Sequence, residues 1–224
     1  MTNPPMLTIK AVIFDHDGTL VDSEGVHCAC WNSVLHAYQQ QLSYTDYCAD
    51  YNGLPTLETA QRIQQKFTLP ISAAELYELK IAALNQHLAL QPFPLLPGAL
   101  EALIHLSQQQ FPLAVASGAN RKEVLHSVAA HKLTPYFAAI STKNDVANSK
   151  PAPDVYLHAA AQLGIEPQYC LAIEDSDTGE QSAIAAGMPC IRLTPAPNNK
   201  TQPCPQFKTL QDALPWLQQL KPAN

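Results

Sequence analysis

The stretch Ala11-Val-Ile-Phe-Asp-His-Asp-Gly-Thr19 decides which fold the rest of the sequence can adopt. Its first four residues are apolar, and an apolar run of this length is typical of a strand buried on both faces of a parallel sheet. An acidic turn follows at once, since Asp-Gly pairs favour turns. Ligands of open α/β sheets bind beyond the carboxyl ends of the strands, so we expect Asp15 and Asp17 to lie at a functional site.

Further short apolar runs occur downstream, and each predicts another buried strand. Helical spacing separates the later runs, with Gly164 placed to end one helix, and a short helix over residues 210–220 is expected to close the chain. Strands that alternate with helices indicate an α/β fold with a doubly wound, Rossmann-like parallel sheet. The downstream runs are Leu113–Ala116, Phe137–Ile140, Leu171–Ile173 and Cys190–Leu193.

One interval, residues 23–91, contains helical spacing and no convincing strand. Cys30, Trp31 and Leu35 mark one predicted helix face, and Leu57 and Ile63 belong to another. A Pro-rich segment over residues 92–98 follows and is typical of a linker. We therefore predict an α/β core domain built from residues 1–22 and 92–224, with an inserted all-helical cap domain spanning residues 23–91.

The composition favours small-molecule chemistry over nucleic-acid or membrane binding. The 224 residues are 46% hydrophobic and carry a formal net charge of −6, without a long Lys/Arg run or an apolar stretch of membrane-spanning length. Of the six cysteines, Cys170 and Cys190 border short apolar runs and Cys28 and Cys30 lie in a helical pattern, which favours reduced thiols in a cytoplasmic protein. Cys28-x-Cys30 lacks a second pair at metal-binding spacing, so helix packing is the better interpretation. We expect a monomer.

Polar clusters follow four of the predicted strands, and the fold would bring them to one crevice. They are Asp15-His-Asp17, Ser117-Gly118, Lys150 (across a short loop) and Glu174-Asp175. The four carboxylates among them would repel one another unless a cation were present. Mg²⁺ prefers oxygen ligands and suits sites that combine carboxylates with phosphate. Together with Lys150, the cation would make the crevice attractive to a phosphate group.

Two aspartates separated by one residue have a particular chemical use. Residues i and i+2 of an extended segment face the same side, so one carboxylate can attack phosphorus while the other moves the leaving group's proton. His16 lies between them and is expected to point away. Ser117 can donate to a phosphate oxygen, and Gly118 would let main-chain N–H groups approach it. Asp177 is expected to be a helix N-cap.

Taken in their order along the chain, the polar clusters after the predicted strands resemble the motifs of the haloacid dehalogenase-like superfamily, and the match covers essentially the whole chain. The helical insertion resembles the cap of the β-phosphoglucomutase-like subfamily. Within it, Asn52-Gly53-Leu-Pro-Thr56 resembles the substrate-specificity loop, particularly that of bacterial sugar-phosphate phosphatases. The matching motifs are Asp15-x-Asp17-x-Thr19, Ser117, Lys150-Pro-x-Pro-Asp154 and Glu174-Asp175-Ser176.

The resemblance implies a magnesium-dependent phosphatase that hydrolyses a small phosphorylated metabolite, such as fructose 1-phosphate, in two steps. Asp15 would form an aspartyl phosphate and Asp17 would act as acid and base, while Ser117 and Lys150 orient the phosphoryl group. Mg²⁺ would be bound by Asp15, the main-chain carbonyl of Asp17 and Asp175, with Glu174 close or direct. The residues expected to contact substrate are Thr19, His27, Gly53, Thr56, Gly118 and Asn120.

A β-phosphoglucomutase-type isomerase is the nearest alternative. The mutases that the chain resembles hold a second phosphate with an arginine of the cap loop, where Thr56 stands here; Arg62 or Lys66 could substitute. A dehalogenase would not need Asp17, and a phosphonatase would need a cap lysine that we cannot place. A non-catalytic phosphosugar-binding protein is the other alternative, and the presence of Asp15 with the metal carboxylates argues against it.

Overall fold

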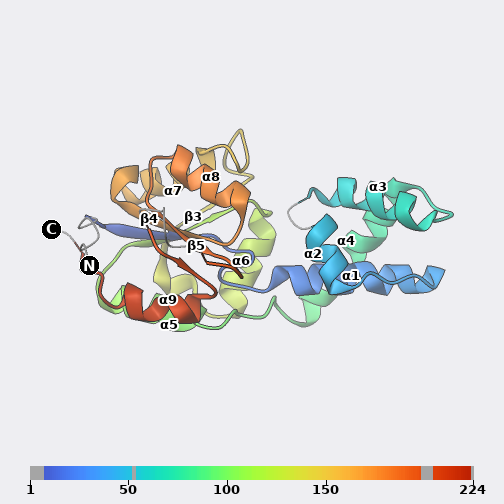
Figure 1. The fold of residues 1–224 in the computed structure, drawn as a ribbon, viewed down its shortest axis with the longest axis horizontal. Coiled ribbons are helices and arrows are strands. Elements are labelled where there is room, and N and C mark those ends of the chain that lie inside the picture. Colours follow the sequence, from blue (N-terminus) through green and yellow to red (C-terminus); the bar gives the residue numbers. More distant parts are fainter. Residues whose placement is uncertain (1–7, 52–53, 198–203, 223–224) are drawn as a thin grey trace. The chain divides into compact units, whose positions relative to one another are not determined.

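Six parallel strands form the centre of the computed structural model, which describes residues 8–51, 54–197 and 204–222. The strands lie in the order β3-β2-β1-β4-β5-β6 (Figure 1). Their bounds are Ala11–Phe14 (β1), Leu113–Ser117 (β2), Phe137–Thr142 (β3), Cys170–Glu174 (β4), Cys190–Leu193 (β5) and Gln206–Phe207 (β6). The predicted doubly wound α/β sheet is therefore confirmed.

All the predicted strands are present, and β1 and β5 have the predicted bounds. The others extend the predicted apolar runs, because polar end residues such as Ser117 and Glu174 also take part in the sheet. The sequence does not predict β6, which has only two residues, Gln206–Phe207, and therefore shows no apolar run.

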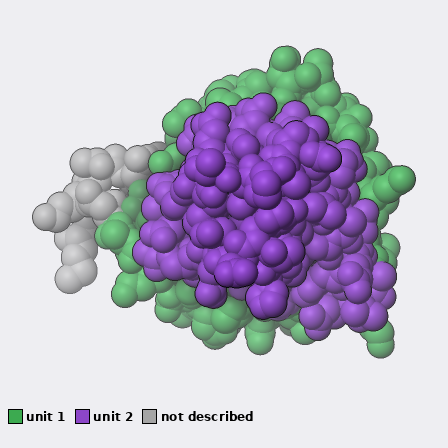
Figure 2. Space-filling model, turned by 90° about the vertical axis from the view of Figure 1, so that its right-hand side faces the viewer, with its two compact units in different colours: residues 1–21, 95–224 green, residues 22–94 purple. Residues whose placement is uncertain are grey.

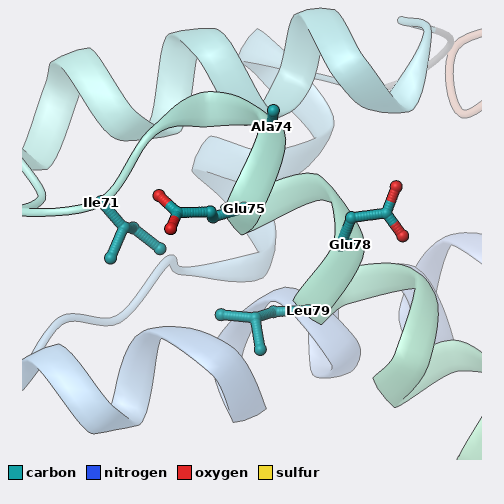
Figure 3. Close-up of a pocket in the computed structure, with 5 residues that line it drawn as sticks. All are labelled: Ile71, Ala74, Glu75, Glu78 and Leu79. Atoms are coloured by element: carbon teal, nitrogen blue, oxygen red, sulfur yellow. The ribbon is translucent and has the colours of Figure 1, made fainter.

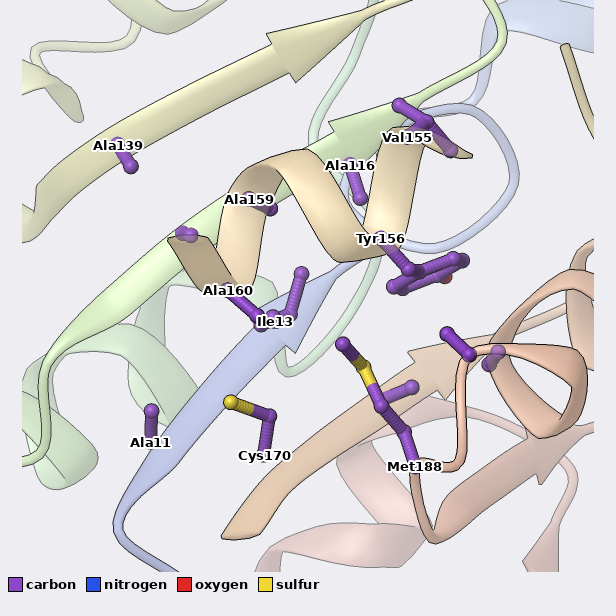
Figure 4. Close-up of a cluster of buried hydrophobic side chains, with 14 residues drawn as sticks. Ala11, Ile13, Ala116, Ala139, Val155, Tyr156, Ala159, Ala160, Cys170 and Met188 are labelled. Atoms are coloured by element: carbon purple, nitrogen blue, oxygen red, sulfur yellow. The ribbon is translucent and has the colours of Figure 1, made fainter. Parts of the chain in front are cut away.

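Different helices cover the two faces of the sheet. Alternate residues of a strand point to opposite faces, and Ala11, Ala114 and Ala172 all belong to one buried cluster with residues of α7 (Asp154–Leu163) and α8 (Asp177–Ala185). Figure 4 shows this cluster, in which small strand side chains lie beneath α7. The helices α5 (Ala99–Gln108) and α9 (Leu210–Leu217) lie on the other face (Figure 1). α6 spans Arg121–Ala130.

The strand order reverses beside β1. From β1 the chain builds β2 and β3 on one side, and it then returns to build β4, β5 and β6 on the other. β1 therefore pairs with both β2 and β4, with Val12 opposite Leu113 and Ala11 opposite Cys170. A crevice forms outside the carboxyl ends of the strands at such a reversal, so the residues that follow β1, β2 and β4 are brought together.

The chain divides into two compact units, coloured green and purple in Figure 2: residues 1–21 with 95–224, and residues 22–94. The first contains the sheet, and the second is helical in its described residues. Where the chain leaves the first unit and re-enters it, Val21 and Leu95 form an antiparallel bridge, and the Leu96 N–H donates to the Leu20 carbonyl oxygen over 2.9 Å. The helices of the second unit are α1 (Ser23–Leu35), a 3-10 turn (His36–Tyr38), α2 (Tyr44–Asp50), α3 (Thr56–Phe67) and α4 (Ala73–Leu90).

The helical unit has a hydrophobic core of its own. Trp31 and Leu35 of α1, Ile63 of α3 and Leu76 of α4 are buried in it, as amphipathic spacing predicts. Leu57 is an exception, because 47% of it is exposed. An α-helix turns about 100° per residue, so Leu57 lies roughly 120° around α3 from Ile63 and falls outside the buried stripe.

Local hydrogen bonds start the helices of this unit. Ser72 and Glu75 form a capping box at α4: the Ser72 hydroxyl accepts from the Glu75 N–H over 3.2 Å, and the Glu75 carboxylate accepts from the Ser72 N–H over 2.9 Å. Cys28 and Cys30 are buried thiols of α1, in keeping with a packing role. None of the described helices is long and apolar enough to cross a membrane.

Candidate active site

Asp15 stands at the carboxyl end of β1, where the sheet continues for one more residue. Its N–H donates to the carbonyl oxygen of Ile173 in β4 over 2.9 Å. The chain then turns sharply, because the N–H groups of Leu20 and Val21 both donate to the His16 carbonyl oxygen. The turn holds the acidic residues of the first motif at the edge where β4 ends.

Gly18 allows this turn to lie against Asp175. Its φ of +77° is a left-handed conformation that glycine adopts without strain. A Cβ at this position would lie 2.0 Å from Oδ2 of Asp175, far inside any real contact distance. Any other residue at position 18 would therefore displace either the turn or the carboxylate.

Lys150 joins two of the acidic residues. Its Nζ lies 2.5 Å from Oδ1 of Asp15 and 2.5 Å from Oε1 of Glu174. The side chains of Lys150, Asp15 and Glu174 are 8%, 7% and 0% exposed. Removing one member of such a buried pair leaves the other charge uncompensated and is strongly destabilising. The ammonium group is therefore needed to keep both carboxylates at this position.

The electrostatics of the cluster show an excess of negative charge. Burial, followed by repulsion from Glu174, raises the pKa of Asp15 well above its ordinary value. The same two causes raise the pKa of Asp175 to about 7. Burial by itself would lower the pKa of Lys150, but Asp15 and Glu174 raise it above its ordinary value. One ammonium group is thus insufficient to neutralise the carboxylates around it.

The three carboxylates can share a metal ion. Asp15, Glu174 and Asp175 each offer an oxygen, and these oxygens all lie within 4.8 Å of one another. A cluster of hard oxygen ligands, in which the pKa values of Asp15 and Asp175 are raised, suits a divalent cation such as Mg²⁺. The donor set and its charge therefore fit the cofactor that the sequence predicts.

Asp17 and Ser117 meet across β1 and β2. The Ser117 hydroxyl donates to Oδ2 of Asp17 over 3.2 Å and accepts from the Ala119 N–H over 2.9 Å. The expectation that His16 points away from the pair is wrong: its ring is buried, and Nδ1 lies 3.2 Å from Oδ2 of Asp17. The reversal after β1 is too tight for simple strand alternation, so the side chain of His16 remains beside its neighbour.

The comparisons with known proteins agree with this arrangement. A family model described as haloacid dehalogenase-like hydrolase matches residues 12–193, a range that holds β2 to β5 and all of β1 except its first residue. The chain belongs to this family. The resemblance that the motifs indicate is thereby confirmed.

Members of the haloacid dehalogenase-like family with named activities are similar to this chain. Fructose-1-phosphate phosphatase YqaB of Escherichia coli (strain K12) is 33% identical over 183 residues, which are 80% of this chain and 94% of that protein. Hexitol phosphatase B of the same organism is 32% identical and covers 87% of each chain. A crystal structure of a HAD family hydrolase from Deinococcus radiodurans R1, with bound phosphate and sodium, is 28% identical with a TM-score of 0.78, over 97% of this chain and 100% of that one.

Three expected substrate-binding residues of this family member lie in the sheet unit. Thr19 is fully buried, and its Oγ1 lies 3.5 Å from Oδ1 of Asp175, so in this conformation it faces a carboxylate. Gly118 is exposed, and a Cβ there would have room, since its nearest contact would be Oγ of Ser149 at 3.7 Å. Asn120 is the exposed N-cap of α6, and its side chain donates to Glu123 over 3.4 Å.

The other three belong to the helical unit. His27 lies in α1, where its Nδ1 is 3.1 Å from Nζ of the buried Lys80 and its ring meets Phe93 edge-on. Thr56 is the half-buried first residue of α3. Gly53 lies outside the described residues. A cavity of about 460 Å³, lined by Ile71, Ala74, Glu75, Glu78 and Leu79 (Figure 3), contains none of the predicted site residues.

Sequence reasoning missed several residues that shape the site. Tyr156 of α7 is fully buried and donates its hydroxyl hydrogen to Glu174; the sequence shows only one more apolar position on a helix face. Ser176, and not Asp177, caps α8, because Ser176 has the extended backbone and its Oγ accepts from the Gly179 N–H over 3.0 Å. Asp177 instead pairs with Arg192 of β5 over 2.8 Å. The Asp17-Gly18 pair predicts a turn, but it does not predict that Gly18 lies against Asp175.

Proposed function

We propose that this enzyme is a magnesium-dependent phosphatase that hydrolyses a small sugar phosphate, such as fructose 1-phosphate, through an aspartyl-phosphate intermediate. The observation that carries the proposal is the contact of Lys150 with both Asp15 and Glu174, beside Asp175 and at the reversal point of the sheet. Phosphatases among the relatives support the enzyme class, phosphoric monoester hydrolase. An anion that entered this crevice would meet a buried cation and a carboxylate nucleophile together.

Two aspartates divide the chemistry. In the first step an oxygen of Asp15 forms a bond to phosphorus, the bond from phosphorus to the sugar oxygen breaks, and Asp17 gives its proton to that oxygen. In the second step water attacks phosphorus, Asp17 takes the proton of the water, and the bond to Asp15 breaks. Asp17 suits this exchange because 27% of its side chain is exposed, whereas only 7% of the Asp15 side chain is.

Lys150 and Ser117 orient the phosphoryl group. Lys150 already contacts Asp15, so its ammonium group can stabilise the phosphoryl oxygens as charge develops on them. The hydroxyl of Ser117 donates to Asp17 before substrate binds. A phosphate oxygen would be a competing acceptor for that hydrogen, and its arrival would leave Asp17 to serve the leaving group.

Mg²⁺ would be held by the carboxylates of Asp15 and Asp175 and the main-chain carbonyl of Asp17, with Glu174 close by. When bound, the ion would neutralise the carboxylates and draw electron density from the phosphoryl group. The fit is supported by the oxygen-only donor set and by the raised pKa values of Asp15 and Asp175, which burial and repulsion from Glu174 produce.

The helical unit would act as the cap that sets specificity, with the enzyme working as a monomer. His27, Gly53 and Thr56 would meet the sugar from the cap. Thr19, Gly118 and Asn120 would serve from the sheet unit. Thr56 cannot clamp a second phosphate as an arginine does, which favours hydrolysis over the mutase reaction.

The test is a panel of phosphorylated metabolites offered to the purified protein, with Mg²⁺ and with EDTA. We expect phosphate release from hexose phosphates that requires Mg²⁺, and no isomerisation of β-glucose 1-phosphate. Isomerisation without net phosphate release would instead establish the mutase.

A second arm tests the nucleophile. Asp15→Asn should lower kcat by about a thousand-fold or more, because an amide cannot form the acyl phosphate. Asp212→Asn, an exposed change in the first turn of α9, is the control and should keep the parent rate. Parental turnover by Asp15→Asn would show that another group attacks phosphorus.

A further inference from the structure

Tyr156 places a hydroxyl group in an otherwise apolar layer. Its side chain is fully buried in the cluster between the sheet and α7, among Ala, Ile, Val, Cys and Met side chains (Figure 4). A phenylalanine would fill the same space without a polar group to satisfy. The hydroxyl nevertheless lies at the layer's boundary with the acidic cluster, where it donates to Oε1 of Glu174 over 2.7 Å.

The carboxylate of Glu174 is fully occupied by donors. Oε1 accepts from Lys150 Nζ over 2.5 Å and from the Tyr156 hydroxyl over 2.7 Å. Oε2 accepts from the Ser176 hydroxyl over 3.2 Å and from the Ser176 N–H over 3.4 Å. A carboxylate offers about four lone-pair positions. A cation that took an oxygen of Glu174 would have to displace one of these donors.

The surrounding backbone also fixes the position of this carboxylate. A Cβ on Gly179, in the first turn of α8, would lie 2.0 Å from the carboxyl atoms of Glu174. Burial and the nearby Glu174 raise the pKa of Tyr156, so its hydroxyl keeps the proton that it donates. Glu174 is thus enclosed by α7 on one side and α8 on the other.

Asp175 differs from Glu174 in its contacts. Among the described residues, its side chain accepts a hydrogen bond from the Thr19 hydroxyl, over a long 3.5 Å to Oδ1. Its pKa is raised by burial and by Glu174, so this carboxylate lacks enough positive charge beside it. Two adjacent acidic residues therefore have different surroundings, and the Tyr156 hydroxyl is one source of that difference.

We propose that Tyr156 is a positioning residue: its hydroxyl holds Glu174 as the anchor of Lys150 and leaves the cation to Asp15 and Asp175. This inference rests on the proposed phosphatase function, because the anchored ammonium group is the one that would receive the phosphoryl oxygens. Without the hydroxyl, Oε1 of Glu174 keeps only the donor from Lys150, so the carboxylate holds Lys150 less firmly opposite Asp15. Partners of this kind typically affect activity or affinity by about ten- to a hundred-fold.

The experiment uses Tyr156→Phe in the full-length protein, which removes one oxygen and keeps the ring. We measure kcat and KM with p-nitrophenyl phosphate, and the dissociation constant of inorganic phosphate for the Mg²⁺-loaded protein by calorimetry. We expect kcat/KM to fall about 10-fold and the phosphate dissociation constant to rise by about as much. Tyr169→Phe, at the opposite end of β4, is the matched control and should change neither.

A double-mutant cycle separates positioning from packing. If Tyr156 acts through Glu174, Tyr156→Phe should have less than about a twofold effect in a Glu174→Gln background. A variant that is only less heat-stable, with unchanged phosphate affinity and unchanged rate per folded molecule, would overturn the proposal. So would full additivity of the two substitutions.

The outcomes also distinguish this inference from the proposed function. If the parent binds phosphate but hydrolyses no phosphomonoester, the phosphatase proposal fails while calorimetry still decides on Tyr156. If the parent binds no phosphate, both fail. Should Tyr156→Phe not fold, Ser176→Gly removes a donor from Oε2 while keeping most of the capping of α8, and the same weakening of phosphate binding is expected.

Discussion

Gly18 and Asp175 lie against each other although they are far apart along the chain. The carboxylate of Asp175 occupies the space that a side chain at position 18 would fill. A similar relation joins Gly179 to Glu174. At the scale of single residues, the acidic cluster is therefore shaped by two glycines as much as by the carboxylates themselves.

Gly18→Ala should therefore weaken metal binding as well as stability. The left-handed backbone costs an alanine roughly 1–2 kcal/mol, and the clash at 2.0 Å adds to this by pushing Asp175 out of place. We expect the Mg²⁺ dissociation constant, measured by calorimetry, to rise about 10-fold or more.

Gly164→Ala is the matched control for this substitution. Gly164 also has a left-handed backbone, with φ of +67°, but an added Cβ there would meet nothing within 4 Å. This variant should lose stability and keep its Mg²⁺ affinity. Equal Mg²⁺ affinities for the two variants would show that the space beside Asp175 is unimportant.

At the scale of elements, α4 depends on its first turn. The capping box of Ser72 and Glu75 satisfies two N–H groups that would otherwise lack partners within the helix. Glu75 is fully exposed, and its pKa is lowered by the hydrogen bonds that it accepts from Ser72. The cap is therefore a local device that stabilises the helical unit without touching the acidic cluster.

Ser72→Ala should lower the free energy of unfolding by about 1 kcal/mol, whereas Ser72→Gly should lower it by only a few tenths. Urea denaturation followed by circular dichroism measures both. The kcat of either variant should equal that of the parent. A loss for Ser72→Gly as large as that for Ser72→Ala would mean that the capping bonds are not the source of the effect.

The sequence predicts the elements well where a run of like residues marks them. The strands β1 to β5 follow from short apolar runs, and the strand-end rule then places Asp15, Ser117 and Asp175 at one edge. The sequence does not predict β6, because its two residues, Gln206–Phe207, are too few to form a pattern. Tyr156 escapes for a different reason: helical spacing gives the face on which a residue lies but not the partner that its hydroxyl meets.

The whole molecule contains more acid than base, and part of that excess is concentrated at the ends of the strands. Burial and Glu174 raise the pKa of Asp175 to about 7 in the folded chain, whereas an unfolded aspartate titrates near 3.9. The folded state thus binds more protons than the unfolded state between these values. The metal-free protein should therefore lose stability as the pH rises from about 4 to about 7.

Mg²⁺ should reverse this trend, because it competes with the protons for the same carboxylates. We expect the rise in Tm on adding Mg²⁺, measured by calorimetry against EDTA, to be small near pH 5 and to grow through pH 7. Asp175→Asn should flatten the pH dependence. A rise in Tm that is the same at every pH would show that these groups do not titrate with metal binding.

The chain leaves the sheet unit and re-enters it at neighbouring positions. Val21 and Leu95 pair directly in an isolated bridge, just before the chain departs and just after it comes back. Residues 22–94 therefore form an insertion whose two ends meet at one place in the sheet unit. If the helical unit sets the specificity, as proposed above, then replacing this one segment would change the substrate that is accepted and leave the acidic cluster of the sheet unit as it is.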